Sequence, residues 1–414
     1  MKHIIHKLNG YTLILIPNNN KTIHITACIK SGTMNETKEN AGIHHLIEHI
    51  LTEAWKPCGK QTCSSYWEKK GVNMNANTHL SYVNFYVNGL KEDIQIMLNY
   101  MFDIIISPFL KDSTLQIEKH AVLNELLILN NNPENKLKDV FNKNFYSNEG
   151  LQHTDDYDLQ IKNLNKMTMT MSKIKSFYNN LQKEIIFIVC GEIKTMPLST
   201  ITNNMKTNKT NKTNKTTKKM KMESLLNENK NQNLIFTYSN KKIHLNYDLK
   251  STIFMMGIPI KTCECHKMVA CLQILNAILF EQLRIQMKII YGIKISLLTL
   301  PYYHIIINVT VENKHIVQVY ETIIKIFEKY KTEPFPQSFI DGMKQKTKLK
   351  YYNTEYTSTY MAGYILNDYL NGEIISMEKK MKDILKMKDS DFIKLMTMNL
   401  NHCLTTYQGK IKGL

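Results

Sequence analysis

A polar tract near the middle of the chain sets the main limit on how this sequence can fold. Residues 205–233 begin MKTNKTNKTNKTTKKMK and are rich in Lys, Thr and Asn. A segment of this composition has too little apolar surface to offset the entropy lost on ordering. We therefore expect a low-complexity linker at 203–233 between two domains, 1–202 and 234–414, each within the usual range of domain size.

The positive charge of the chain is shared unevenly between the linker and the rest. The 414 residues carry a formal net charge of +17, and residues 203–233 hold eight Lys and two Glu. Elsewhere lysine is dispersed, and Arg284 is the single arginine. Nucleic-acid recognition favours arginine and aromatic residues clustered on one face, whereas dispersed lysine is typical of a solvated surface. We expect no nucleic-acid partner, and a basic nucleic-acid-binding protein is kept as a rival hypothesis.

The sequence shows neither a long apolar run nor a leader of the ordinary type. No run approaches the roughly 18 apolar residues that a membrane-spanning helix needs, and Met1 to Asn20 resembles a polar-flanked strand. We expect a cytoplasmic protein with no membrane span, and a mitochondrion or mitochondrion-related organelle is the alternative location. The eight cysteines are thinly spread, so free thiols are expected and disulfides are not.

Apolar periodicity predicts a similar order of strands and helices in both halves. Sheets backed by helices in this arrangement are the α+β class, which we predict for each half. Ser113 and Gln116 have the spacing of a capping box and predict the start of a helix. The predicted strands are 11–17, 22–30, 82–87, 185–190, 252–260, 293–298, 303–312 and 404–408; predicted helices start at Ala41 and cover 66–71, 92–106, 113–129, 268–286 and 316–330.

One short motif in the first half has the spacing of a metal site. His45, Glu48 and His49 stand at offsets of zero, three and four, so a helix places all three side chains on one face. Two imidazoles one turn apart can chelate one zinc ion, and a carboxylate beside them can take a proton from the attacking water. The order H-x-x-E-H is that of inverted zinc peptidases. The alternative is a helix whose histidines are surface or satisfied core groups.

A second predicted helix offers a third ligand. Glu118 and Glu125 are seven residues apart and therefore share a helix face. One of them can bind zinc while the other orients a histidine ligand. The alternative is that both glutamates are solvated, which is common for paired acidic residues on a helix.

These residues resemble the pitrilysin and insulinase family, which includes mitochondrial processing peptidase. The resemblance extends over nearly the whole chain and includes the segments 31–36 and 41–43 before the inverted motif. It implies that Glu125 is the third zinc ligand and that Glu118 is a further essential glutamate. It also implies that Asn75, Ala76, Asn77 and Thr78 form an edge strand that pairs with an extended substrate; the alternative is an ordinary strand entry.

The second half carries a further resemblance to this family. Leu283-Arg284 followed by Tyr291 resembles a Leu-Arg and Ala-Tyr pair, which implies that Arg284 and Tyr291 hold the substrate carbonyl. In a chain that otherwise uses lysine, a single arginine also fits a site that needs a planar, bidentate hydrogen-bond donor. The alternative is that this arginine is there by chance and has no function. The glycine-rich loop of the processing peptidase's partner subunit has no visible counterpart. For Cys263-Glu264-Cys265-His266 we favour a plain loop over a metal site.

The resemblance implies two domains that form a clamshell around a peptide cleft. The expected function is that of a zinc-dependent endopeptidase with one zinc ion per chain, acting on peptides or unfolded protein segments. A homodimer, or a heterodimer with a related subunit, is the expected assembly. The alternative function is a catalytically silent assembly subunit of a processing or respiratory complex, although such subunits typically lose ligands and none is missing here.

Overall fold

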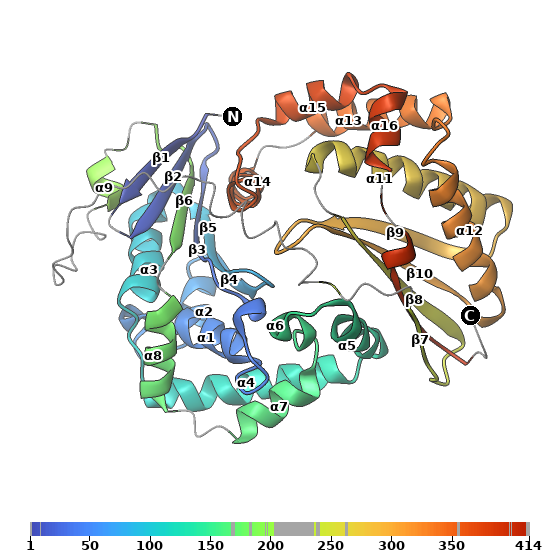
Figure 1. Ribbon diagram of the computed structural model, residues 1–414. Coiled ribbons are helices and arrows are strands. Elements are labelled where there is room, and N and C mark those ends of the chain that lie inside the picture. Colours follow the sequence, from blue (N-terminus) through green and yellow to red (C-terminus); the bar gives the residue numbers. More distant parts are fainter. Residues whose placement is uncertain are drawn as a thin grey trace. The chain divides into compact units, whose positions relative to one another are not determined.

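The computed structural model describes two compact units (Figure 1). The described residues are 2–8, 10–166, 170–181, 184–194, 196, 198–202, 236, 241–260, 264–353, 357–396, 398 and 400–410. Unit 1 consists of the described residues within 1–130, 157–227 and 355–374, and unit 2 consists of those within 131–156, 228–354 and 375–414. The predicted linker, 203–233, lies outside the described residues.

Unit 1 is built on a six-stranded mixed sheet. The central strands are nearly continuous apolar runs, because helices cover both faces. Along β2 (Tyr11–Pro17), Leu13 and Leu15 belong to the core beneath α3 (Ile94–Ile106), whereas Ile14 and Ile16 face α14 (Ser358–Leu370) on the other side. The strand order is β1 (Ile4–Leu8), β2 (Tyr11–Pro17), β6 (Ile185–Gly191), β3 (Thr22–Ile29), β5 (Val83–Leu90) and β4 (Asn73–Thr78). Strands β2 and β6 pair in parallel, and the other neighbours in this order pair antiparallel.

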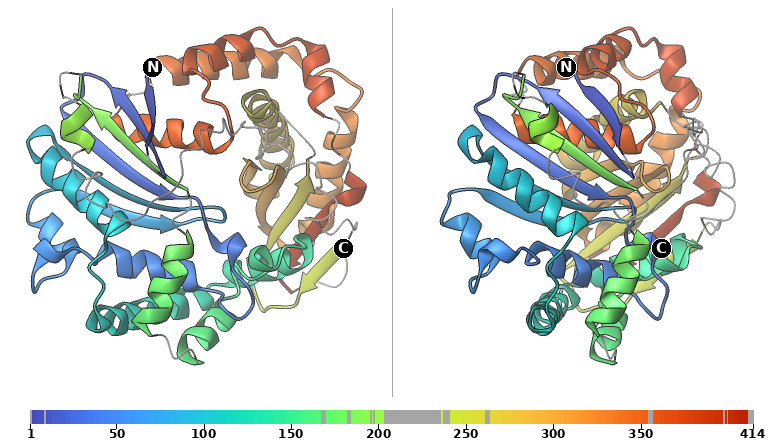
Figure 2. Two further views of the ribbon diagram at one scale, coloured as in Figure 1. Left: turned by 60° about the vertical axis from the view of Figure 1, so that its left-hand side comes forward. Right: turned by 90° about the vertical axis from the view of Figure 1, so that its left-hand side faces the viewer.

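The helices of unit 1 place the candidate metal residues against one end of this sheet. Helix α1 (Ile43–Thr52) packs on β4 and β5, and α4 (Asp112–Asn130) packs on α1. On the other face, α14 (Ser358–Leu370) lies against β3 and β6, as the orange helix beside the blue and green strands in Figure 2. The other helices are α2 (Cys63–Glu68), α3 (Ile94–Ile106), α7 (Tyr157–Lys166), α8 (Met171–Leu181) and α9 (Leu198–Thr202), with short 3-10 turns at Thr33–Asn35, Lys56–Cys58 and Lys91–Asp93.

Unit 2 is also built on a sheet with helices on both faces, and this sheet has five strands. On one face α11 packs on β9, and α12, α13 and α16 pack on α11 in the same core; on the other face α5 packs on β8 and β11. Phe254, Met256 and Ile258 lie in the core on the α11 side. The strand order is β7 (Lys241–Leu245), β11 (Leu404–Gln408), β8 (Ser251–Pro259), β10 (His304–Glu312) and β9 (Ile290–Leu298). The helices are α5 (Pro133–Phe145), α6 (Glu149–Gln152), α11 (Cys265–Phe280), η6 (Glu281–Gln286), α12 (Ile316–Lys329), α13 (Gln337–Asn353), α15 (Met377–Leu385) and α16 (Asp389–Leu395), with 3-10 turns at Asn313–His315 and Leu400–His402.

Each sheet has one face covered by a helix from the opposite half of the sequence. Helix α14 lies between α13 and α15 in the second half of the chain but packs on the sheet of unit 1, where the Ser358 hydroxyl donates to the carbonyl of Thr22 over 2.8 Å. Helix α5 belongs to the first half but packs on β8. A Cβ at Gly257 would lie 2.4 Å from Phe141 and 2.8 Å from Phe145, so this strand needs glycine there. The compact units therefore differ from continuous halves by these two exchanged segments.

The predicted α+β class is confirmed for both units, and most element positions agree with the pattern. The predicted strands 11–17 and 404–408 coincide with β2 and β11. Several helix starts were wrong. The helices predicted at 66–71 and 268–286 begin three residues earlier, at Cys63 and Cys265. Helix α1 begins at Ile43, because Gly42 is its left-handed N-cap with φ +94°. Helix α4 begins at Asp112, so Ser113 lies inside its first turn and not at the cap.

One helix contradicts the expectation that no segment has the length and hydropathy of a membrane span. Residues Cys265–Gln286, which form α11 and η6, are long and apolar enough by those two criteria alone. Half of the apolar 18-residue stretch within this segment is buried in the structure. Its buried apolar side chains, among them Leu275 and Leu279, belong to the core of unit 2. Packing in that core accounts for its apolar composition.

The expectation that disulfides are absent was also wrong. Cys58 and Cys63 form a disulfide whose Cα atoms lie 5.3 Å apart. The chain turns back between the 3-10 turn at Lys56–Cys58 and the start of α2, and this turn brings the two sulfurs together although only five positions separate them. Cys28, Cys190 and Cys271 remain buried thiols, and Cys263 lies outside the described residues.

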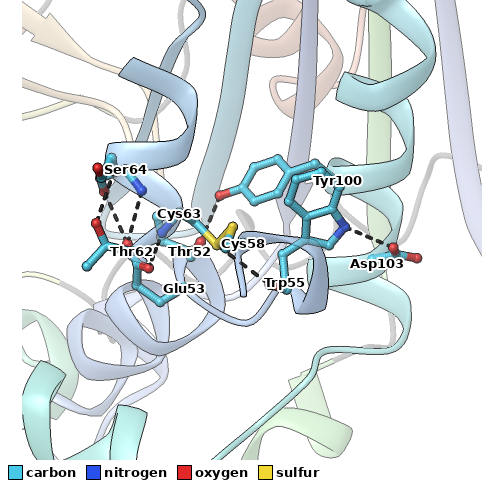
Figure 3. The surroundings of a disulfide bond; sticks show 10 residues. Thr52, Glu53, Trp55, Cys58, Thr62, Cys63, Ser64, Tyr100 and Asp103 are labelled. Carbon is cyan, nitrogen blue, oxygen red and sulfur yellow. Dashed lines mark hydrogen bonds between the residues drawn. A yellow bond between two sulfur atoms is a disulfide. The ribbon is translucent and has the colours of Figure 1, made fainter. Parts of the chain in front are cut away.

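The disulfide lies just beyond the carboxyl end of α1 (Figure 3). Glu53, the C-cap of α1, accepts hydrogen bonds from the backbone N–H of Cys63 and from Ser64. The Tyr100 hydroxyl donates to the carbonyl of Thr52 over 2.9 Å. The Trp55 indole donates to Asp103 over 3.0 Å. These bonds tie the end of α1 to both α2 and α3.

Cysteine mapping tests the disulfide directly. In denaturant without reductant, Cys58 and Cys63 should resist alkylation, whereas Cys28 and Cys190 should be modified fully. After reduction all four should react. Closing so short a loop should stabilise the fold by about 2 kcal/mol. Complete alkylation of Cys58 and Cys63 before reduction would show that the bond is absent.

Candidate metal site

Helix α1 presents two histidines to one side of unit 1. His45 and His49 are four residues apart on α1, and their rings lie 4.9 Å apart between centroids. Their side chains are partly exposed, with fractions of 18% and 24%. His44 points the other way and is fully buried. The amphipathic pattern of α1 therefore puts the buried residues on the sheet and leaves His45 and His49 at the surface of the unit.

Helix α4 brings its two glutamates to these histidines. Glu125 Oε2 lies 3.5 Å from His45 Nε2 and 3.6 Å from His49 Nε2. Glu118 Oε2 lies 3.2 Å from His49 Nδ1, the opposite nitrogen of the same ring. The structure thus brings His45, His49 and Glu125 together and places Glu118 behind His49.

The three donor atoms fit the requirements of zinc. They all lie within 4.8 Å of one another, a separation that one ion can bridge. In a tetrahedral site with bonds of about 2.1 Å, neighbouring donors are about 3.4 Å apart. The two Nε2–Oε2 distances, 3.5 and 3.6 Å, are close to that value and long for hydrogen bonds. Two imidazoles and one carboxylate also leave a fourth position open, as catalytic zinc sites do.

The electrostatics of this cluster favour bound positive charge. Burial by itself would lower the pKa of His49, but interactions with Glu118 and Glu125 and the charge of Glu48 outweigh it and raise the pKa to about 9. Interactions with His45 and His49 hold the pKa of Glu125 well below its usual value. A cation in the cluster would replace the proton on His49.

Glu48 lies on the same helix and makes one side-chain hydrogen bond that ties it to the sheet. It is 9% exposed, and its Oε2 accepts a hydrogen bond of 2.6 Å from the hydroxyl of Thr78. Thr78 is the last residue of β4. The bond occupies one carboxylate oxygen of Glu48 and restricts its rotation. A carboxylate held in this way can accept a proton at its other oxygen.

Strand β4 is the edge strand of its sheet, as the family resemblance implies. It pairs with β5 on one side, and among the described residues no strand pairs with its other side. Burial alternates along it. Ala76 is buried and Thr78 half-buried toward α1, whereas Asn75 and Asn77 are exposed on the opposite face. The backbone of β4 therefore offers a free edge beside Glu48.

Arg284 and Tyr291 come together in unit 2. The Arg284 guanidinium lies 5.2 Å from the centre of the Tyr291 ring and donates to the carbonyl of Ile290 over 3.1 Å. Arg284 sits in η6, a π-helical segment, a rare geometry that is frequent at functional sites. Tyr291 is 84% exposed, a large value for an aromatic side chain. Their predicted role toward a substrate carbonyl stays a prediction.

Sequence reasoning missed one element of the site. Glu36 is 4% exposed, and its carboxylate accepts hydrogen bonds from the backbone N–H groups of Gly42 and His44 and from the His44 ring. The segment 31–36 was assigned to the family pattern without a role for this carboxylate. The available signal was a carboxylate shortly before a helix that lacks a capping side chain.

The comparisons with known proteins agree with this geometry. Residues 13–154 match the family described as Insulinase (Peptidase family M16). The chain carries a domain of the insulinase family, peptidase family M16. The matched segment contains α1, β4 and α4, and therefore Glu48 and the three candidate ligands. The predicted family is confirmed.

The relatives found by sequence align with this chain over only part of their length. The uncharacterized zinc protease YmxG of Bacillus subtilis is 26% identical over 146 residues, 34% of this chain and 35% of that protein. Cytochrome b-c1 complex subunit 1, mitochondrial, of Bos taurus is 23% identical over 118 residues, 28% of this chain and 25% of that protein. The chain thus spans about a third or less of the length of these relatives.

Solved structures show the same fold over nearly the whole chain. A protease from Helicobacter pylori superposes with a TM-score of 0.81 at 16% identity and covers 98% of this chain and 99% of its own. A peptidase M16 inactive domain from Pseudomonas fluorescens has a TM-score of 0.80 at 12% identity and covers 100% and 99%. At these identities the likeness shows the fold alone.

The raised pKa of His49 predicts a pH-dependent zinc affinity. Zinc must displace the proton that His49 carries below pH 9, so the apparent affinity should rise about tenfold per pH unit between pH 7 and 9. Competition with a chromophoric chelator at several pH values measures this. In Glu118→Gln, which loses a charged partner of His49, the steep range should move to lower pH. An affinity that is flat between pH 7 and 9 would contradict the prediction.

Proposed function

We propose that this chain is a zinc-dependent endopeptidase with one zinc ion per chain. The observation that carries the proposal is the convergence of His45, His49 and Glu125 at zinc-ligand spacing, with Glu48 held beside them. The M16 match and the relatives named as zinc proteases support it. The inverted order of the motif fits the same class of enzyme.

The residues divide the chemistry between them. When bound, zinc would lower the pKa of the attacking water and polarise the substrate carbonyl. Glu48 takes a proton from that water at the oxygen that Thr78 leaves free, and later passes it to the leaving amine. Glu118 fixes the ring of His49 through Nδ1, which keeps Nε2 directed toward Glu125.

The substrate class follows from the free edge of β4. An extended peptide can add to Asn75–Thr78 as a further strand, and such pairing recognises backbone conformation more than side chains. Folded segments cannot offer a free strand, so peptides and unfolded protein segments are the proposed substrates. Because Thr78 ends this strand and bonds to Glu48, a peptide paired with β4 would pass close to the proposed base.

Arg284 and Tyr291 are the proposed partners of the substrate carbonyl. A guanidinium donates from a fixed plane, and a tyrosine hydroxyl donates a single hydrogen bond. Donors aimed at a developing oxyanion are typically worth about 3 kcal/mol each. The high exposure of Tyr291 supports a role toward a ligand, since its hydroxyl is available for an incoming group.

Replacing Glu48, the proposed base, should distinguish its effect on zinc binding from its effect on peptide cleavage. Glu48→Gln keeps the shape of the side chain but cannot accept the proton, so we expect zinc content to stay near one ion per chain and peptide cleavage to fall by a factor of at least about 1,000. His45→Ala should lose the zinc. Glu68→Gln, the same substitution at an exposed position of α2, is a matched control that should leave both unchanged. Cleavage by Glu48→Gln at the wild-type rate would refute the role of this residue.

Removing the Thr78 hydroxyl should have a smaller effect than removing the base, and this effect should fall on kcat. Thr78→Val keeps the shape of the strand but frees the Glu48 carboxylate, so kcat should fall about tenfold or more while KM and zinc content change little. Thr78→Ser should restore most of the activity. Unchanged kcat in Thr78→Val would show that the bond has no part in catalysis.

A second candidate function is assembly without catalysis. The bovine relative named as a cytochrome b-c1 complex subunit and the solved inactive M16 domain both motivate it. A homodimer or a heterodimer with a related subunit fits either function. Elemental analysis of the purified protein decides between them: about one zinc per chain supports the peptidase, and a metal-free, inactive protein supports the assembly role.

A further inference from the structure

The helix that carries His45 and His49 starts without a capping side chain of its own. Its N-cap is Gly42, which has a left-handed backbone and no side-chain hydrogen bond. The first N–H groups of a helix need partners, because the helix itself supplies none. The carbonyl of Asn40 accepts from Ile43 N over 3.0 Å, and Glu36 accepts from the N–H groups on either side of it. Its Oε2 accepts from Gly42 N over 2.8 Å and its Oε1 from His44 N over 2.9 Å.

A buried histidine links this carboxylate to a serine hydroxyl. The hydrogen-bonded chain Glu36–His44–Ser31 is called the relay below. His44 Nδ1 lies 2.9 Å from Glu36 Oε1, and His44 Nε2 lies 3.0 Å from the Ser31 hydroxyl. Ser31, Glu36 and His44 are 7%, 4% and 0% exposed, so none of them can act on a substrate. A buried carboxylate and a buried imidazole with fully paired polar atoms form a specific, rigid contact.

The loop that carries Ser31 and Glu36 is fixed in turn to the end of β4. Thr33 N donates to the carbonyl of His79 over 3.1 Å, and Met34 N donates to the carbonyl of Leu80 over 2.9 Å. A Cβ at Gly32 would lie 2.2 Å from the carbonyl oxygen of His79, so the two backbones are in close contact. Residues 79 and 80 directly follow Thr78, the partner of Glu48.

We propose that Glu36, His44 and Ser31 are positioning residues that set the register of α1 against β4. The relay holds the start of α1, and the loop it belongs to holds the end of β4. Together they fix the candidate ligand His45, which follows His44 directly, relative to the strand proposed to take the substrate. This inference rests on the proposed function and adds to it the residues that position the site.

Matched variants separate this role from ordinary stabilisation. His24 is also a buried histidine, 4% exposed, with a hydroxyl partner, Thr26, at 2.8 Å, but it faces α14 across the sheet. Ser31→Ala and Thr26→Val each remove one hydroxyl from a buried histidine. Glu36→Gln and His44→Phe break the relay itself, and His24→Phe is the control for the latter.

The readouts are zinc affinity by chelator competition, kcat and KM on an unstructured peptide, and the melting temperature of the metal-free protein. All five variants should lower the melting temperature. Glu36→Gln and His44→Phe should also weaken zinc binding about tenfold and lower kcat more than KM changes. Ser31→Ala should show a smaller loss, restored by Ser31→Thr, and the His24 and Thr26 variants should keep zinc affinity within about twofold of the wild type.

Two results would overturn the proposal. If Glu36→Gln and Ser31→Ala bind zinc as the wild type does, the relay only stabilises the fold, and the proposed function survives. If the wild type itself binds no zinc, both the proposed function and this inference fail. Should His44→Phe not fold, Ser31→Ala still decides the question, because it removes a single hydroxyl.

Discussion

The packing of α1 against α4 is the contact on which the candidate site depends. His45 and His49 come from one helix and Glu125 from another, about 75 positions later in the chain. Neither helix alone can surround an ion, since each supplies ligands on one side only. A shift of one residue in α4 would turn Glu125 by about 100° around its helix axis and remove it from the pair of imidazoles. The site therefore requires a fixed register between α1 and α4.

Several structural features resist such a shift. The N-terminal end of α1 is held by the Glu36 carboxylate, and its C-terminal end by Glu53, Tyr100 and the disulfide region of Cys58 and Cys63. The middle of the helix is buried against β4 and β5 through apolar side chains such as Leu46 and Ile50. Polar bonds at both ends combined with apolar packing in the middle specify one position, whereas apolar packing alone tolerates sliding.

In both units, a helix from the other half of the sequence covers the second apolar face of the sheet. Strands such as β2 and β8 are apolar on both faces, and a single layer of helices covers only one of them. Helix α14 covers the second face in unit 1, and α5 covers it in unit 2. Because each of these helices is distant in sequence from the sheet it covers, the halves cannot be divided at one point of the chain without exposing an apolar face.

The sequence by itself determined the α+β class, the family and the candidate ligands. Periodicity and spacing are local properties: offsets of three and four put His45, Glu48 and His49 on one helix face, and the apolar pattern marked strands such as 11–17 and 404–408. It could also offer Glu118 and Glu125 as a pair, though the residues alone did not say which of them binds the ion.

The tertiary structure decided what depends on contacts between distant segments. It placed Glu125 between the two imidazoles and Glu118 behind one of them, and it joined Thr78 to Glu48. It also showed the Glu36 cap, the Cys58–Cys63 bond and the exchanged helices, none of which has a periodic signature. The physical reason is that hydrogen bonds and packing between elements are set by their relative register, which no local pattern encodes.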